Sequence, residues 1–171
     1  MDPIRFAIFE SWFGTISVAE RDGRIISLDL SDNDMYQEHR ALLKRYPDSV
    51  ESEQSFKKLR TLLHRYLKGQ PVDFDIEVDI SDLPDFTRRV LNELRTIPYG
   101  ETKSYSDIAI RAGCPKGCRA VGQALKKNPI PIIIPCHRVI RQDGSLGGFG
   151  LGEKIKKRLL FLEGIKKTWS V

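Results

Sequence analysis

The most constraining stretch of this chain is residues 128–139, which read NPIPIIIPCHRV. Its three prolines lack the backbone N–H that a strand ladder requires, and they fix φ. An apolar run that resembles a buried strand is therefore predicted to be an extended, largely buried connector. Pro135 favours the first position of a helical turn, which would place Cys136 where unpaired N–H groups stabilise a thiolate. Cys136 is then either a poised nucleophile or, as most free cysteines are, a small buried apolar side chain.

Length and composition indicate an intracellular globular protein. The 171 residues suffice for one compact unit with two lobes, and no apolar run approaches the roughly 20 residues that span a bilayer. The first residues lack the basic start and long apolar core of a signal peptide. We therefore expect a cytoplasmic location, or a nuclear one in a eukaryote, and no membrane partner. Three cysteines, an odd number, do not make a secreted disulfide framework.

The charge is divided unevenly between the two halves of the chain. Residues 1–84 carry 11 Lys and Arg against 16 Asp and Glu, a net charge of −5. Residues 85–171 carry 17 against 7, a net charge of +10, and this basic half contains Cys136. Such asymmetry favours a polyanionic partner on the C-terminal side, although solvated basic faces are also common.

Residues 1–80 are predicted to form a structural α/β domain. Alternating apolar residues predict strands at residues 5–9, 15–19, 26–30 and 74–80, with a tight turn at Asp22-Gly23. Helical spacing predicts helices at residues 35–46 and 56–67 of this domain, and a further helix at residues 86–97 beyond it. His39 and His64 have no second potential ligand one helical turn away, so nothing before residue 81 is predicted to carry chemistry. Residues 81–84, Ser-Asp-Leu-Pro, are expected to link this domain to a C-terminal domain of residues 85–171.

A pair of short helices is predicted in the basic half. Ser104 is a good N-cap for a helix over residues 105–112, and after a glycine-containing break a second helix covers residues 118–127. The pattern matches a helix-turn-helix whose second helix reads DNA, although an ordinary helical corner shares it. Small residues make the second helix slim, which would let it approach a nucleic-acid groove or, alternatively, pack against another helix. The residues predicted to face DNA are Ser104, Arg119, Ala120, Gly122, Gln123 and Lys126.

Glu163 ends the last predicted helix, residues 153–163, and Gly164 supplies its C-terminal cap. A carboxylate at this position lies against the negative end of the helix dipole and needs compensation. His137 is a candidate, because a carboxylate holding one ring nitrogen would leave the other to take the proton of Cys136, directly or through a water molecule. The alternative is an exposed helix-end glutamate.

Several motifs in the C-terminal half occur together in one order and spacing. PCHRV at residues 135–139 is preceded by RAVG at residues 119–122 and by Asn128-Pro129, and it is followed by Glu163-Gly164. In these motifs the region from about Pro84 to Gly164 resembles the O6-alkylguanine-DNA alkyltransferase family, also called methylated-DNA–protein-cysteine methyltransferase. The N-terminal region resembles the family's ribonuclease-H-like domain only in size and order of elements. The resemblance implies an α/β (α+β) fold, in which that lobe lies beside a mostly helical C-terminal domain containing the helix-turn-helix.

The resemblance also implies a reaction and the residues that perform it. The reaction would be direct reversal of O6-alkylguanine, and of O4-alkylthymine, by irreversible single-turnover transfer of the alkyl group to Cys136 after nucleotide flipping. His137 would be the base through a water molecule, Glu163 would orient it, and Tyr105 would donate a hydrogen bond or proton to the guanine. Arg119 would fill the gap left by the flipped nucleotide while the second helix enters the minor groove of double-stranded DNA. The implied hinge is Asn128, and the implied pocket residues are Leu125, Pro131, Val139, Gly148, Phe149 and Gly150. No cofactor and no metal are implied, and a monomer is expected.

The chain departs from the family pattern in two places, and two alternatives stay open. Phe149-Gly150 stands where members often carry Tyr-Ser or Tyr-Ala, so backbone N–H groups would have to replace hydroxyl donors to O6. Residues 1–84 contain no cysteine, so the zinc site of some members is not expected. The alternatives are a non-catalytic alkylated-DNA-binding protein, which would lack the acceptor cysteine, and a zinc-stabilised helix-turn-helix regulator using Cys114, Cys118, Cys136 and His137. Cys114 and Cys118 could instead form a disulfide that braces the turn, or have no role.

Overall fold

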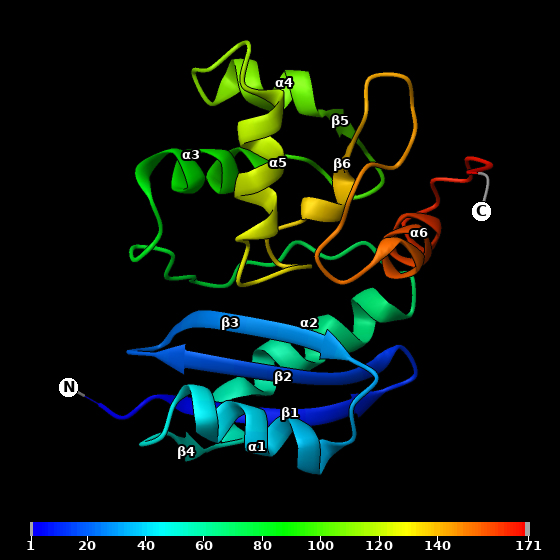
Figure 1. Ribbon diagram of the computed structural model, residues 1–171. Coiled ribbons are helices and arrows are strands. Elements are labelled where there is room, and N and C mark those ends of the chain that lie inside the picture. Colours follow the sequence, from blue (N-terminus) through cyan, green and yellow to red (C-terminus); the bar gives the residue numbers. More distant parts are fainter. Residues whose placement is uncertain (1, 170–171) are drawn as a thin grey trace.

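The N-terminal strands form one four-stranded sheet in the computed structural model, which describes residues 2–169 (Figure 1). The strand order is β3-β2-β1-β4, in which the first three strands are antiparallel and β4 pairs in parallel with β1. Asp22 and Gly23 have φ of 51° and 76°, as a tight hairpin between β2 and β3 requires, so the predicted turn is confirmed. The strands are β1 (Arg5–Ser11), β2 (Gly14–Arg21), β3 (Arg24–Ser31) and β4 (Val50–Glu51).

Helices cover both faces of this sheet. Because strand side chains alternate between faces, Phe6 and Ile8 pack with Leu42 of α1, whereas Ala7 and Phe9 belong to the larger core that contains α2. The predicted helices are confirmed as α1 (Met35–Arg45) and α2 (Lys57–Leu67), the latter preceded by the 3-10 turn η1 (Gln54–Phe56).

The predicted strand over residues 74–80 is wrong. Only an isolated bridge forms there, between Ile25 and Val78, with hydrogen bonds from Ile25 N to Glu77 O and from Asp79 N to Ile25 O. The free edge of β3 is shared, because further along it Leu28 N donates to Pro129 O at 2.9 Å. The edge of β3 therefore pairs with two segments, residues 77–79 and Pro129, whereas the alternation of apolar residues had predicted one strand there.

The C-terminal region is mostly helical, as predicted. Helices α3 and α4 pack on α5, and α6 lies beside the turn that carries Cys136 (Figure 1). The helices follow the predicted ranges, although α3 ends at Leu94 rather than at residue 97. The elements are α3 (Asp85–Leu94), β5 (Lys103–Ser104), α4 (Tyr105–Arg111), α5 (Cys118–Lys126), the 3-10 turn η2 (Cys136–Arg138), β6 (Val139–Ile140) and α6 (Glu153–Leu162).

The connector predicted at residues 128–139 lies between the sheet and α5. Residues 130–140 are all buried, and the four isoleucines between positions 130 and 134 belong to one hydrophobic cluster that also contains residues of β1, β2 and α2. Ile132 adopts a φ of 74°, which is rare for a β-branched residue and requires firm support from its surroundings. A single core thus holds the segment that presents Cys136. Within residues 2–169, no helix is long and apolar enough to cross a membrane.

Candidate active site

Cys136 begins η2, a 3-10 helix of one turn, and is almost fully buried, with 4% of its surface exposed. Burial raises the pKa of the Cys136 thiol to about 11, and the Asn128 hydrogen bond and the charge of Lys156 offset this only in part. The backbone N–H groups of Cys136 and His137 favour the thiolate, as predicted for the start of a helical turn, but burial outweighs them, so the predicted thiolate is wrong. Their effect is small because η2 is one turn of three residues and Cys136 N already donates to Ile134 O at 2.8 Å. The resting side chain is a protonated thiol.

Asn128 connects the end of α5 to the Cys136 thiol. Its Nδ2 donates to Cys136 Sγ at 3.1 Å and to Ile134 O at 2.9 Å, and its Oδ1 accepts from Ile130 N at 3.0 Å. These three hydrogen bonds fix the start of the connector relative to the thiol. This geometry is compatible with the hinge role expected for Asn128.

His137 and Glu163 are fully or nearly fully buried and meet directly, because His137 Nε2 lies 2.6 Å from Glu163 Oε1. Burial opposes ionisation of the carboxyl, but the hydrogen bonds and charges of His137 and Arg138 lower the pKa of Glu163 to about 2. Burial lowers the pKa of His137, against the opposing effect of Glu163. His137 Nδ1 has no hydrogen-bond partner among the described residues. The pair therefore consists of an ionised carboxylate and a neutral imidazole whose Nδ1 is available as a base.

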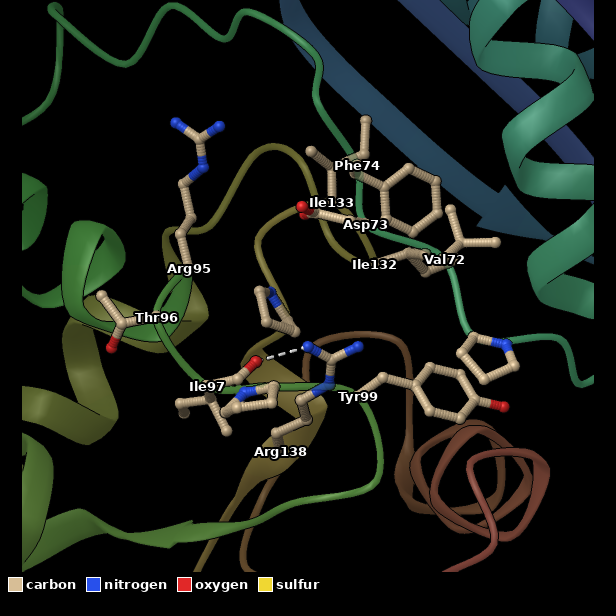
Figure 2. Close-up of a pocket in the computed structure, with 13 residues that line it drawn as sticks. Val72, Asp73, Phe74, Arg95, Thr96, Ile97, Tyr99, Ile132, Ile133 and Arg138 are labelled. Atoms are coloured by element: carbon tan, nitrogen blue, oxygen red, sulfur yellow. Dashed lines mark hydrogen bonds between the residues drawn. The ribbon is translucent and has the colours of Figure 1, made fainter.

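Two further side chains hold Glu163, and sequence reasoning missed both. Arg138 Nε donates to Glu163 Oε2 at 2.9 Å. Its Nη1 donates to Ile97 O at 2.6 Å, and Figure 2 marks this second bond with a dashed line. Tyr66 of α2 donates its hydroxyl proton to Glu163 Oε1 at 2.6 Å, and the hydroxyl oxygen of Tyr66 lies 3.1 Å from His137 Nε2. Tyr66 lies before residue 81, where no residue was predicted to carry chemistry, and its helical spacing had marked it only as a core residue.

Lys156 is a third residue that was missed. Its side chain is completely buried, and Nζ donates to the carbonyl oxygens of Val139 at 2.6 Å, Leu146 at 2.5 Å and Gly148 at 3.4 Å. Burial lowers the pKa of Lys156 to about 8. The sequence did contain one indication that Lys156 is buried, because it lies three residues before Leu159 and therefore on the inward face of α6.

Cys136 opens on a cavity of about 260 Å³. Tyr105 stands at its wall, with its hydroxyl 3.4 Å from Gly148 O, and burial raises the pKa of this phenol. A larger cavity of about 430 Å³ lies behind Arg138 and does not include Cys136 (Figure 2). The residues that line the Cys136 cavity are Tyr105, Gly122, Gln123, Leu125, Lys126, Cys136, Arg141, Gly148, Phe149 and Gly150.

The structure does not support pocket roles for Pro131 and Val139. Both are buried elsewhere: Pro131 forms a bridge with Ile134 inside the connector, and Val139 pairs with Lys103 of β5. Arg141 was not predicted, yet it lines this cavity and also an adjoining groove of about 400 Å³.

The adjoining groove leads from the Cys136 cavity to the start of α5, and Tyr105, Arg141 and Gly148 line both. Arg119 lines its far end and is exposed. Ala120, Gln123 and Lys126 are exposed on α5 and Gly122 is half-buried, whereas Val121 and Ala124 face the core. The hydroxyl of Ser104 is engaged, because it caps α4 by accepting from Asp107 N at 3.1 Å. The predicted DNA-facing residues of α5 thus share one surface.

Cys114 and Cys118 are free thiols, so the disulfide considered for them is not formed. Among residues 2–169, no three His, Cys, Asp or Glu side chains gather as metal ligands, and the four ligands of the zinc-regulator alternative are not brought together.

Comparisons with known proteins place both regions of the chain in one family. Residues 85–165 match the family described as 6-O-methylguanine DNA methyltransferase, DNA binding domain, and residues 4–80 match its ribonuclease-like domain. The chain is 40% identical over 162 residues to the methylated-DNA–protein-cysteine methyltransferase of Sulfolobus acidocaldarius, and the aligned region covers 95% of this chain and 94% of the relative. It is 40% identical over 160 residues to the enzyme of the same name from Methanosarcina acetivorans, covering 93% of this chain and 97% of that one.

The fold comparison agrees with the sequence comparison. The crystal structure of Mycobacterium tuberculosis OGT in complex with DNA matches with a TM-score of 0.80 at 35% identity, over 94% of this chain and 93% of that chain. The O6-methylguanine-DNA methyltransferase of Pyrococcus kodakaraensis, at 23% identity and a TM-score of 0.68, shares the fold.

Proposed function

The chain belongs to the 6-O-methylguanine DNA methyltransferase family, whose function is DNA repair by alkyl transfer to a cysteine, and we propose that Cys136 is the acceptor. The observation that carries this proposal is the position of Cys136 at a cavity that a groove connects to α5, with the buried His137–Glu163 pair behind it. The substrate is double-stranded DNA containing O6-alkylguanine, bound through the minor groove by a monomer.

The first step is removal of the thiol proton. With a pKa of about 11, the free thiolate at neutral pH would cost roughly 5 kcal/mol, so a base has to take the proton as the sulfur attacks. His137 is the residue after Cys136, and its Nδ1 has no hydrogen-bond partner among the described residues, Cys136 included. We infer that the proton passes through one water molecule to Nδ1, and that Glu163 stabilises the resulting imidazolium.

The second step is displacement at the alkyl carbon. The sulfur forms a bond to that carbon while the bond from carbon to guanine O6 breaks, and the electron pair stays on the guanine. Tyr105, in the cavity wall, donates a hydrogen bond or proton to the guanine ring, which makes it a better leaving group. Phe149 and Gly150 supply no hydroxyl, so backbone N–H groups of that loop are left to bind O6. The thioether has no easy reverse reaction, so each molecule acts once.

The target base has to leave the duplex to reach this cavity. Extrusion of a nucleotide costs a few kcal/mol, which contacts in the groove and pocket have to offset. The small residues Ala120 and Gly122 allow α5 to approach the minor groove, and Arg119 is free to occupy the space of the flipped nucleotide. The net charge of +10 on residues 85–171 supports binding to the phosphate backbone.

The direct test is the mass of one peptide. Trypsin would release residues 128–138, which contain Cys136 and no other cysteine. Incubation with duplex containing O6-methylguanine should add one methyl group to this peptide per lesion repaired, and a Cys136→Ser variant should neither gain the methyl group nor repair. Full repair with an unmodified Cys136 would overturn the assignment. Lesion binding by the wild type without any transfer would instead support the non-catalytic alternative.

The role of Arg119 needs a comparison of two substrates. Arg119→Ala should weaken reaction with the methylated duplex while leaving reaction with free O6-benzylguanine largely intact, because the free base needs no flipping. Lys116→Ala is a matched control, since it removes an exposed cation from the turn before α5. Equal loss on both substrates would argue against a role for Arg119 in nucleotide flipping.

A further inference from the structure

Tyr66 is the only described residue before position 85 that forms hydrogen bonds with the His137–Glu163 pair. It lies on α2, 71 residues before His137, and its side chain is completely buried. Its ring packs edge-on against Phe74 and His137, with centroid distances of 5.6 and 6.4 Å. A phenylalanine would satisfy that packing equally well, so the buried hydroxyl needs a separate explanation.

Resting on the proposed function, we propose that Tyr66 is a positioning residue for alkyl transfer, whose hydroxyl holds His137 in the tautomer that leaves Nδ1 free to act as the base. The phenol touches neither the thiol nor the cavity that Cys136 opens on, so it acts through His137 and Glu163.

The donors and acceptors around His137 decide which ring nitrogen carries the proton. Glu163 is ionised and can only accept, so the single proton of the Tyr66 hydroxyl points to Glu163 Oε1 at 2.6 Å. The lone pairs of the same phenol oxygen then face His137 Nε2 at 3.1 Å. Nε2 also lies 2.6 Å from Glu163 Oε1, so it is flanked by two acceptors and no donor. Nε2 must therefore carry the proton of the neutral ring, and Nδ1 must be unprotonated.

Burial, and then the charge of Glu163, raises the pKa of Tyr66 well above its usual value, so the hydroxyl keeps its proton at any pH at which the reaction is measured. The titratable and charged groups around His137 are Glu163 and Lys156 from α6 and its end, Arg138 and Cys136 from η2, and Tyr66 from α2.

Tyr99 offers a matched control. Its hydroxyl lies 3.0 Å from the backbone carbonyl oxygens of Gly69 and Leu162, which share its one proton, and it donates to neither member of the pair. Tyr66→Phe and Tyr99→Phe therefore remove the same atom from two neighbouring rings. Their centroids are 6.1 Å apart, and only Tyr66 contacts the base.

The experiment measures the single-turnover rate with free O6-benzylguanine as a function of substrate concentration and pH, so that DNA binding plays no part. For Tyr66→Phe we expect the rate constant at saturation to fall about tenfold, a fraction of what a general base contributes, with the half-saturation concentration unchanged. The acid limb of the pH profile should also shift, because the His137 imidazolium loses the phenol oxygen as an acceptor and faces a Glu163 carboxylate that has lost one donor. Tyr99→Phe should retain the wild-type profile.

The outcomes separate the two hypotheses. A wild-type protein that does not react with O6-benzylguanine or with methylated duplex contradicts the proposed function itself. A wild type that reacts, with Tyr66→Phe matching it in rate and pH profile, overturns the role of Tyr66 alone. Should Tyr66→Phe fail to fold, the ¹⁵N spectrum of the labelled histidines in the wild type still decides, because a His137 that carries its proton on Nδ1 contradicts the inference.

Discussion

Replacing Lys156 by methionine would remove a buried ammonium group with little change in side-chain volume. The group is surrounded by carbonyl oxygens of Val139, Leu146 and Gly148, and none of its hydrogen bonds within residues 2–169 goes to a carboxylate. Three polar bonds therefore compensate a full charge that is completely buried. The substitution tests whether that ammonium group destabilises the folded state at neutral pH, as its surroundings require.

The expected magnitude follows from the pKa of Lys156, which burial lowers from 10.5 to about 8. Below pH 8 both the folded and the unfolded chain hold the proton, and the folded state bears the whole cost of burying the charge. Between pH 8 and 10.5 the unfolded state holds more protons, so the free energy of unfolding rises with pH. A shift of this size corresponds to about 3 kcal/mol, which the wild type should gain across this range and Lys156→Met should not.

Urea denaturation at a series of pH values measures this difference. Both proteins should carry Cys136→Ser, because the Cys136 thiol, with its pKa of about 11, also titrates near this range. Lys154→Met is the control, since it removes an exposed ammonium from the same helix and should follow the wild type at every pH. A constant stability difference between Lys156→Met and the wild type from neutral pH to about pH 10.5 would refute the reasoning.

Three more predictions concern the cavity and Cys136. Gly147→Ala should lower the rate with O6-benzylguanine about tenfold or more, because the new Cβ would lie 2.6 Å from the Tyr105 hydroxyl on a backbone with φ of 71°; Gly150→Ala, which meets nothing within 4 Å, should not. Asn128→Ala should lower the free energy of unfolding in urea by about 1–3 kcal/mol, since it breaks three part-buried hydrogen bonds. Alkylation of Cys136 by iodoacetamide should accelerate about tenfold per pH unit up to roughly pH 10, and a flat profile would show that the thiol is already ionised.

The sequence predicted those features that depend on local rules. Helical spacing and glycine breaks located α2, α4 and α5, and the prolines of the connector correctly excluded a long strand despite its run of isoleucines. The dipole argument for Glu163 correctly required a compensating partner. It found His137 but not Arg138, although Arg138 is the next residue, because spacing along the chain cannot show which way an η2 side chain points.

Properties that depend on the three-dimensional surroundings of a residue could not be predicted from the sequence. The sequence places Cys136 near a helical turn, but the pKa of its thiol is governed by the burial of the whole connector, which outweighs the local backbone effect. Lys156 shows the same limit, because a lysine in an amphipathic helix is normally solvated. The strand predicted at residues 74–80 would have needed the edge of β3, but part of that edge is hydrogen-bonded to Pro129 instead.

Tyr66 shows why the N-terminal region cannot be understood as a cover alone. The sheet, α2 and the connector share one hydrophobic cluster, and Leu28 N of β3 bonds directly to Pro129 O at the start of the connector. The same packing that buries the connector brings the Tyr66 hydroxyl to Glu163 and His137. A change in how α2 packs on the sheet would therefore move a hydrogen-bond partner of the base without altering any residue of the cavity. Core substitutions near Tyr66 should affect the chemistry more than equally buried ones beneath α1, which belong to a separate cluster.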